Sequence, residues 1–260
     1  MKQDDLRRAA EALWRTRREE RRIDHLPPEL RPATLAEGYD IQDAMVAAAG
    51  QPVTGWKIAA TSTVGQKHIG VTEPLSGRLF RDFVLPDGAH RRAKNMHMRV
   101  AEAEFAFKMG TTLPARDRDY TLGEVCDAVS AMHLAIEIPD ARFQVFDTIG
   151  APAIAADDAF ADWFILGREV PNWRDIDLPN HPVHGKKNGT VVSEGKGANA
   201  LGDPRLALTW LANHLARRGT PLETGHVITT GTCLKPVDIG AGDTVVADFG
   251  SLGTVTAHFD

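Results

Sequence analysis

The clearest pattern in this chain is a short alternating segment, Ala101-Glu102-Ala103-Glu104-Phe105-Ala106-Phe107. Successive side chains of a β-strand point to opposite faces, so a strand here places the apolar residues at odd positions on one face. Glu102 and Glu104 then share the other face, about 7 Å apart along the strand. Carboxylates that close repel each other unless water or a cation lies between them. The segment therefore predicts a sheet with one apolar and one acidic face, the latter being either solvated surface or a cation site.

A third acid interrupts a second apolar strand pattern. It is Glu137, in the segment Leu134-Ala135-Ile136-Glu137-Ile138-Pro139. Burying a lone carboxylate is costly, so this side chain must be paired, hydrogen-bonded or bound to a metal ion. Beside Glu102 and Glu104 it would complete the all-oxygen ligand set that Mg²⁺ or Mn²⁺ prefers. The sequence alone does not show whether the three acids converge.

Lys57 presents the same anomaly with the opposite charge. Its segment, Thr54-Gly55-Trp56-Lys57-Ile58-Ala59-Ala60, is otherwise an apolar strand pattern. One interpretation is that the ammonium reaches water along its own aliphatic stem. The other is that it serves a nearby acidic site, where it would bind a substrate carboxylate, stabilise an enolate oxygen or move a proton. The pattern alone leaves both open.

Short apolar or alternating runs separated by Gly and Pro dominate the chain from Gly55 onward, which indicates a mostly β core. Helical patterns come before it, in residues 3–24 and after Thr34, which forms a capping box with Glu37. We predict an α+β fold with an N-terminal helical extension (residues 1–54) and a single functional domain (residues 55–260). Further helices are expected at Leu122–Met132 and Pro204–Arg218, and strands at Gly55–Ala60, Val100–Met109, Leu134–Ile138, Ala161–Gly167, Thr190–Glu194, Val227–Thr230, Thr244–Asp248 and Thr254–Phe259.

The composition is that of an ordinary globular protein, with 43% hydrophobic and 25% charged residues among 260. A formal net charge of -5 provides no chain-wide attraction for phosphate backbones, so nucleic acid is not an expected partner. Apolar runs stop well short of the roughly 20 residues of a membrane span. Cys126 and Cys233 lie far apart, and the chain begins without an apolar signal segment. We therefore expect a cytoplasmic protein without disulfides.

Short motifs recur along nearly the whole chain, and each is weak alone, whereas the set is specific. Besides the helical N-terminal part, the set comprises Gly55-Trp56-Lys57-Ile58, Gly70-Val71 with Pro74, Glu102-Ala103-Glu104, Ala135-Ile136-Glu137, Gly202-Asp203-Pro204, Trp210-Leu211-Ala212, Thr230-Gly231-Thr232, and Gly242-Asp243-Thr244 with Asp248-Phe249. Together these motifs resemble the 2-oxopent-4-enoate hydratase and 4-oxalocrotonate decarboxylase group of the fumarylacetoacetate hydrolase superfamily.

The resemblance implies a site as well as a fold. Glu102, Glu104 and Glu137 match the family's acidic metal ligands, for Mg²⁺ or Mn²⁺, and Lys57 matches its active-site lysine. Thr230, Gly231 and Thr232 match a loop that lines the substrate site. The implied fold is a mixed β-roll, and the implied assembly is a cytoplasmic homo-oligomer such as a pentamer or decamer. Family members degrade aromatic compounds after ring cleavage.

Two positions depart from the family's pattern. Leu75 follows Pro74 where many hydratases carry Asp, and Phe160 stands where Ser or another small residue is frequent. We expect both residues to line the substrate pocket. An apolar residue at 75 removes a candidate acid or base for water addition, and Phe160 reshapes the site of the substrate's tail.

The resemblance implies a metal-dependent lyase that hydrates 2-hydroxypenta-2,4-dienoate (2-oxopent-4-enoate), or a longer homologue, to the 4-hydroxy-2-oxo acid. The nearest alternative is decarboxylation of a 4-oxalocrotonate-type 2-oxo-3-enedioate, because metal-assisted enolisation serves both reactions. A carbon-carbon hydrolase would need a base, for which His68, His90 and His97 are candidates. A further alternative is a non-catalytic subunit that keeps the fold and assembles with a related enzyme.

Overall fold

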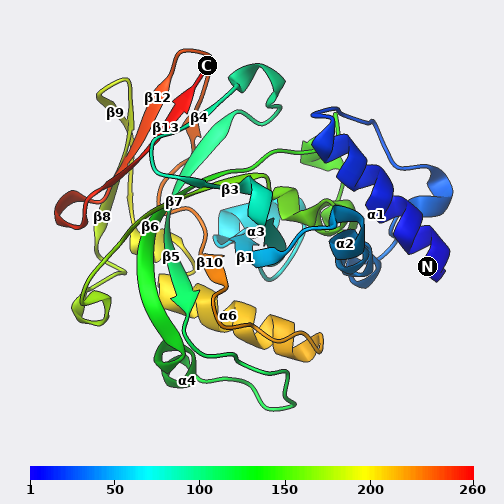
Figure 1. Ribbon diagram of the computed structural model, residues 1–260, viewed down its shortest axis with the longest axis horizontal. Coiled ribbons are helices and arrows are strands. Elements are labelled where there is room, and N and C mark those ends of the chain that lie inside the picture. The colour runs from blue at the N-terminus through cyan, green and yellow to red at the C-terminus, as the bar shows by residue number, and fades with distance from the viewer.

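A computed structural model of the chain describes residues 1–260 and shows two curled β-sheets with helices packed around them (Figure 1). Two N-terminal helices, α1 (Gln3–Arg18) and α2 (Leu35–Ala49), lie together at one side of the sheets, and α6 (Pro204–Arg217) lies at another. None of the helices combines the length and apolar character needed to cross a membrane. The remaining helices are short: α3 (Thr63–Ile69), α4 (Leu122–Asp127) and α5 (Ala151–Ala156).

The larger sheet contains eight strands and mixes parallel with antiparallel pairs. At its centre the long strands β5 (Val100–Met109) and β6 (Val129–Ile138) run antiparallel. In spatial order it comprises β2 (Leu75–Phe80), β1 (Val53–Ala59), β10 (Val227–Thr229), β5, β6, β7 (Trp163–Glu169) and β3 (Val84–Pro86), with β11 (Val237–Asp238) also paired to β5.

The smaller sheet and α6 cover the apolar face of β5. The alternation predicted for residues 101–107 is confirmed, because the alanines and phenylalanines at odd positions are all buried in the main core. This core also contains Val245 and Val255 of the smaller sheet and Leu208 of α6. The smaller sheet comprises, in order, β4 (Ala89–Arg91), β13 (Thr254–Phe259), β12 (Thr244–Asp248), β8 (Pro182–Lys187) and β9 (Thr190–Lys196).

A second core joins the N-terminal helices to the larger sheet. Leu13 of α1 and Met45 of α2 pack with Phe80 of β2 and Ile154 of α5. Thr34 caps α2 by accepting a hydrogen bond from the backbone N–H of Glu37. The α+β class and the N-terminal helices are thus confirmed, and the β5, β12 and β13 bounds agree with the predicted strands.

One predicted helix is wrong in its second half. The Thr121 and Glu124 capping box is present, but α4 ends at Asp127, and residues 129–132 belong to β6. These residues pair with β5, where Ala131 lies opposite Lys108 and Met132 opposite Phe107. Pairing with a strand some twenty-five residues away overrides the local helical pattern, since tertiary context outweighs propensity.

Strand β2 was absent from the predicted set. All six of its residues are buried, so it shows no alternation, and Gly77 at its centre argues against a strand. The structure shows why glycine is needed there. A Cβ atom on Gly77 would lie 2.1 Å from the carbonyl oxygen of Asp158, so only glycine permits this close approach of two backbones.

His214 of α6 makes the stability of the helical packing depend on pH. Its ring lies 5.0 Å from that of Tyr39 and 4.9 Å from that of Trp210, and its Nε2 atom has no hydrogen-bond partner. Burial, assisted by the nearby Arg218 and Arg217, lowers the pKa of His214 to about 4. An unfolded chain binds this proton near the ordinary pKa of about 6.5. Stability is therefore lost as the pH falls from 6.5 toward 4.

We predict that His214→Phe, which keeps a flat ring but cannot be protonated, flattens this dependence. The slope of unfolding free energy against pH should decrease by at most about 1.4 kcal/mol per pH unit in this window. Urea titrations at pH 4.5, 5.5 and 6.5 measure it. The same substitution at the exposed His25 is the control. Equal slopes in the two variants would contradict the assignment.

Candidate metal centre

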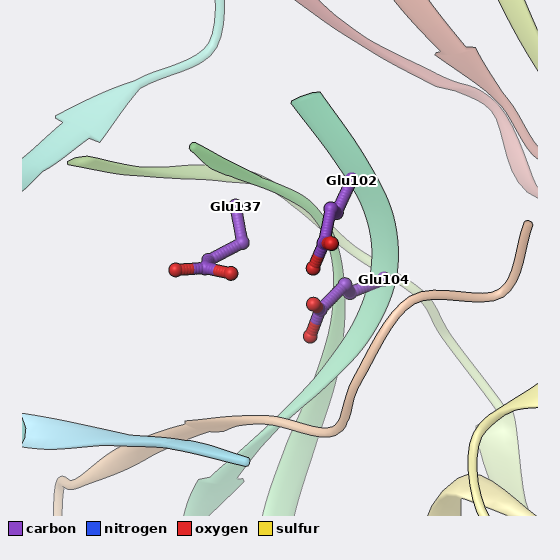
Figure 2. A group of neighbouring side chains, drawn as sticks. All are labelled: Glu102, Glu104 and Glu137. Atoms are coloured by element: carbon purple, nitrogen blue, oxygen red, sulfur yellow. The ribbon is translucent and has the colours of Figure 1, made fainter. Parts of the chain in front are cut away.

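Three carboxylates, from β5 and β6, point toward one another on the larger sheet (Figure 2). Glu102 and Glu104 alternate along β5, and Glu137 of β6 lies directly opposite Glu102 in the antiparallel register. Residues directly opposite in such a pair share a face. One oxygen from each of the three side chains lies within 4.8 Å of the others. The structure therefore brings together the three acids that the sequence singled out.

The acidic face is not a solvated surface. Glu104 and Glu137 are 1% and 0% exposed, and Glu102 is half-buried. Glu104 accepts hydrogen bonds at Oε2 from the Thr229 hydroxyl and from the Gly231 N–H, the latter at 2.7 Å. Glu137 Oε1 has no hydrogen-bond partner. A buried carboxylate oxygen without a donor is costly and indicates a ligand.

Lys57 supplies the one cation beside these acids. It lies on β1, is 4% exposed, and holds Nζ 3.1 Å from Glu137 Oε2 and 3.1 Å from the carbonyl oxygen of Ala159. The contact with Glu137 is an ion pair without hydrogen-bond geometry. Of the two interpretations of Lys57, the structure therefore excludes escape of the ammonium to water.

Burial raises the pKa of all three acids. It raises the pKa of Glu104 to about 8, with the charge of Glu102 adding to the effect. It raises the pKa of Glu137 well above its ordinary value and that of Glu102 as well, while the Lys57 ammonium opposes both shifts. Burial also acts to lower the pKa of Lys57, but the three carboxylates outweigh it and the pKa is raised.

These residues fit a hard divalent cation. When ionised, the three carboxylates and Lys57 carry a formal charge of -3 + 1 = -2, which a divalent ion neutralises. The donors are all carboxylate oxygens, the ligands that Mg²⁺, Mn²⁺ and Ca²⁺ take. Glu137 Oε1, buried and without a partner, is a free ligand atom.

A cavity of about 630 Å³ opens beside the acidic cluster. Its wall includes Lys57 and Glu102, together with three residues expected to bind substrate, namely Phe160, Gly231 and Thr232. A cavity of this size accommodates a small organic acid. His68 also lines it, whereas His90 and His97, the other candidate bases, do not.

Two residues expected in the pocket do not line it. Leu75 is fully buried in the core beneath the N-terminal helices, where it pairs with Ala59 across β1 and β2. Thr230 is also fully buried, and its hydroxyl donates to the carbonyl oxygen of Phe105 at 2.8 Å. Thr230 thereby anchors the loop after β10 to β5, and the next residue, Gly231, reaches Glu104.

Sequence reasoning missed two contributors to this site. The first is the carbonyl oxygen of Ala159, which accepts a hydrogen bond from Lys57. The position of a backbone atom cannot be read from a sequence pattern. However, Asp157 and Asp158, two acids between apolar runs, indicate a buried polar segment nearby. The second is Lys235, an exposed residue in the cavity wall that forms no ion pair. A single surface lysine has no distinguishing pattern.

The family model for the fumarylacetoacetate (FAA) hydrolase C-terminal domain matches residues 45–260. The chain therefore belongs to the FAA hydrolase family, which confirms the resemblance inferred from its motifs.

Relatives within the family are hydratases and decarboxylases. The chain is 35% identical over 215 residues to a 2-keto-4-pentenoate hydratase of Burkholderia vietnamiensis, covering 81% of this chain and 79% of the relative. It is 34% identical over 232 residues to a 4-oxalocrotonate decarboxylase of Pseudomonas sp. (strain CF600), covering 87% and 86%. The solved 4-oxalocrotonate decarboxylase of Pseudomonas putida, complexed with magnesium and adipate, matches with a TM-score of 0.91 and 28% identity, covering 100% of this chain and 99% of that one.

We predict that Glu137→Gln, which keeps the side chain's shape, destabilises the chelator-treated protein because it breaks the buried ion pair with Lys57. It should also abolish stabilisation by Mg²⁺ or Mn²⁺. In the wild type that stabilisation is about 2.7 kcal/mol when the free ion is at a hundredfold excess over Kd. Thermal unfolding with and without cation measures both effects, and Glu194→Gln, on the exposed edge strand β9, is the control. Cation stabilisation equal to that of the wild type would exclude Glu137 from the centre.

Proposed function

We propose that this protein is a metal-dependent hydratase that converts 2-hydroxypenta-2,4-dienoate, or a longer homologue, to the 4-hydroxy-2-oxo acid during the breakdown of aromatic compounds. The observation that carries the proposal is the meeting of Glu102, Glu104 and Glu137 with Lys57 at the wall of a cavity large enough for such an acid. The names of the relatives support the substrate class.

We propose Mg²⁺ or Mn²⁺ as the cofactor, held by the three glutamates. The chemistry of the donor set supports it, as does the magnesium bound by the decarboxylase of similar structure. When bound, the ion acts as a Lewis acid toward a 2-oxo acid. Glu104 is the most constrained of the three, because Thr229 and Gly231 hold one of its oxygens in place.

Hydration requires two proton transfers to carbon. In the first, the substrate's 2-hydroxyl loses a proton and C5 gains one, which produces a 2-oxo-3-enoate. In the second, the oxygen of water adds to C4, the water loses a proton and C3 gains one. Lys57 is the group we assign to these transfers and to balancing charge on the substrate oxygens. Its ammonium is fixed between Glu137 and the Ala159 carbonyl, so it is oriented before substrate arrives.

The proposed enzyme class also suggests where the protein acts and how it assembles. We propose a cytoplasmic homo-oligomer, a pentamer or decamer, with small-molecule partners rather than nucleic acid or membrane. The net charge of -5 supports the absence of a nucleic-acid partner. The exposed Val191 and Val192 on the edge strand β9 support contact with another copy. Light scattering of the purified protein measures the assembly.

The deciding test for turnover is an assay of the purified protein with Mg²⁺ or Mn²⁺ and 2-hydroxypenta-2,4-dienoate. We expect loss of the dienol's ultraviolet absorbance with formation of the 4-hydroxy-2-oxo acid. Lys57→Met should reduce kcat by about 10²-fold to 10⁴-fold, the usual contribution of a positioned proton-transfer group. Lys108→Met, at an exposed position on β5, is the matched control.

Two other outcomes of this assay would favour the alternative functions. Carbon dioxide release from a 2-oxo-3-enedioate without hydration of the dienol would reject the hydratase in favour of the decarboxylase. Absence of both metal binding and turnover would favour a non-catalytic subunit.

The decarboxylase is the second candidate because the cavity wall carries a second lysine, Lys235, besides Lys57. We expect the second carboxylate of a dicarboxylate substrate to pair with the Lys235 ammonium, which forms no ion pair within the protein. The decarboxylase of similar structure is complexed with adipate, a dicarboxylate.

We predict that Lys235→Met weakens inhibition by adipate about 1.4-fold to fivefold, the range of an exposed ion pair. Inhibition by hexanoate, which has the same length but one carboxylate, should not change. Lys67→Met, at an exposed position on α3 outside the cavity wall, is the control. Equal weakening of both inhibitors would contradict a role for Lys235 in recognising the second carboxylate.

A further inference from the structure

The backbone that holds Lys57 has a rare conformation. Asp158, Ala159 and Phe160 are consecutive residues with φ values of 56°, 50° and 60°, in the left-handed region. Non-glycine residues reach this region singly, and each costs free energy that the surroundings must offset. The segment presents the carbonyl oxygen of Ala159 to Lys57 and the side chain of Phe160 to the cavity.

The buried side chain of Arg17, which does not line the cavity, binds residues of this segment. Arg17 of α1 places Nη1 3.2 Å from Asp158 Oδ2, and the two side chains are 2% and 1% exposed. Asp158 Oδ1 accepts a hydrogen bond from the backbone N–H of Arg78 on β2 at 2.6 Å. Arg17 also donates to the side chain and the carbonyl oxygen of Asp162, on the far side of the segment. The guanidinium thus bridges residues before and after Ala159 and Phe160.

The segment lies directly against the strands that carry Lys57. Gly77 of β2 is the register partner of Lys57 on β1, and a Cβ atom there would lie 2.1 Å from Asp158 O and 3.1 Å from Lys57 Cγ. Any shift of the segment therefore moves the Ala159 carbonyl relative to the lysine.

We propose that Arg17 is a positioning residue for Lys57, acting through the ion pair with Asp158 and the left-handed segment Asp158–Phe160. On this proposal the first helix of the chain is a support of the active site, although it lies outside the region matched by the family model, residues 45–260. The role in turnover rests on the proposed function. The role in placing Lys57 does not.

Arg17→Met is the principal test, with Arg7→Met as the matched control. Arg7 lies on the same helix but forms only surface ion pairs, with Asp4 and Glu11. We expect Arg17→Met to reduce kcat about tenfold to a hundredfold, the usual effect of misplacing a reacting group by about 1 Å. The Kd for Mg²⁺ should stay within about twofold, because the three glutamates lie on β5 and β6. Arg7→Met should behave as the wild type.

Further variants separate positioning from general loss of structure. Arg17→Lys, which keeps the charge, should recover part of the lost kcat. Gly77→Ala displaces the segment from the opposite side and leaves α1 intact, so it should reproduce the kcat loss. Because both act on one segment, the double variant should lose less than the product of the single losses. If Arg17→Met does not fold, Arg17→Lys and Gly77→Ala still decide the matter.

Crystal structures provide the readout that does not depend on turnover. The contact between Lys57 Nζ and Ala159 O, 3.1 Å here, should be lost in Arg17→Met and kept in Arg7→Met. Retention of this contact, wild-type kcat in folded Arg17→Met, or a loss confined to KM or Mg²⁺ affinity would each overturn the proposal. If the wild type turns over neither the dienol nor the enedioate, the proposed function fails, and the structures still test the placement of Lys57.

Discussion

The arrangement of this protein depends on one electrostatic constraint, the meeting of three carboxylates with a single lysine in a mostly buried space. Isolated charges are not stable in such surroundings, so each must have a partner. Glu104 accepts hydrogen bonds from the end of β10 and from the loop that follows it, and Glu137 pairs with Lys57. The unpartnered oxygen of Glu137 and the excess of negative charge show that the protein's own groups leave the set incomplete. A divalent cation completes it.

The two faces of β5 serve different purposes. Its odd-numbered residues pack into the main core, while Glu102 and Glu104 lie on the other face, where Glu102 lines the cavity. The core thus fixes the strand that carries the ligands, and the antiparallel register with β6 sets Glu137 opposite Glu102. A register shift of one residue would send Glu137 to the other face. Pairing of the two central strands is therefore a condition for the site and not only for the fold.

The alternation in residues 101–107 and the lone acid in residues 134–138 were enough to predict the two central strands and to single out the acidic set. The local sequence pattern did not predict elements whose structure depends on contacts with residues distant in sequence. Strand β2 is buried on both faces, residues 129–132 join β6 through pairing with β5, and Leu75 packs beneath helices that a linear pattern does not place. The Ala159 carbonyl is a backbone group, and its position follows from ion pairs formed by residues distant in sequence.

Hydration and decarboxylation of related 2-oxo acids both need electrons to be withdrawn toward the 2-oxo group, so the acidic set and Lys57 do not distinguish them. The difference must lie where the substrates differ, at the end remote from the metal centre. The cavity wall contains Lys235, whose ammonium suits a second carboxylate, and the aromatic side chain of Phe160. Phe160 belongs to the left-handed segment that also holds Lys57. A substitution at Phe160 is therefore expected to change the placement of Lys57 as well as the shape of the cavity wall.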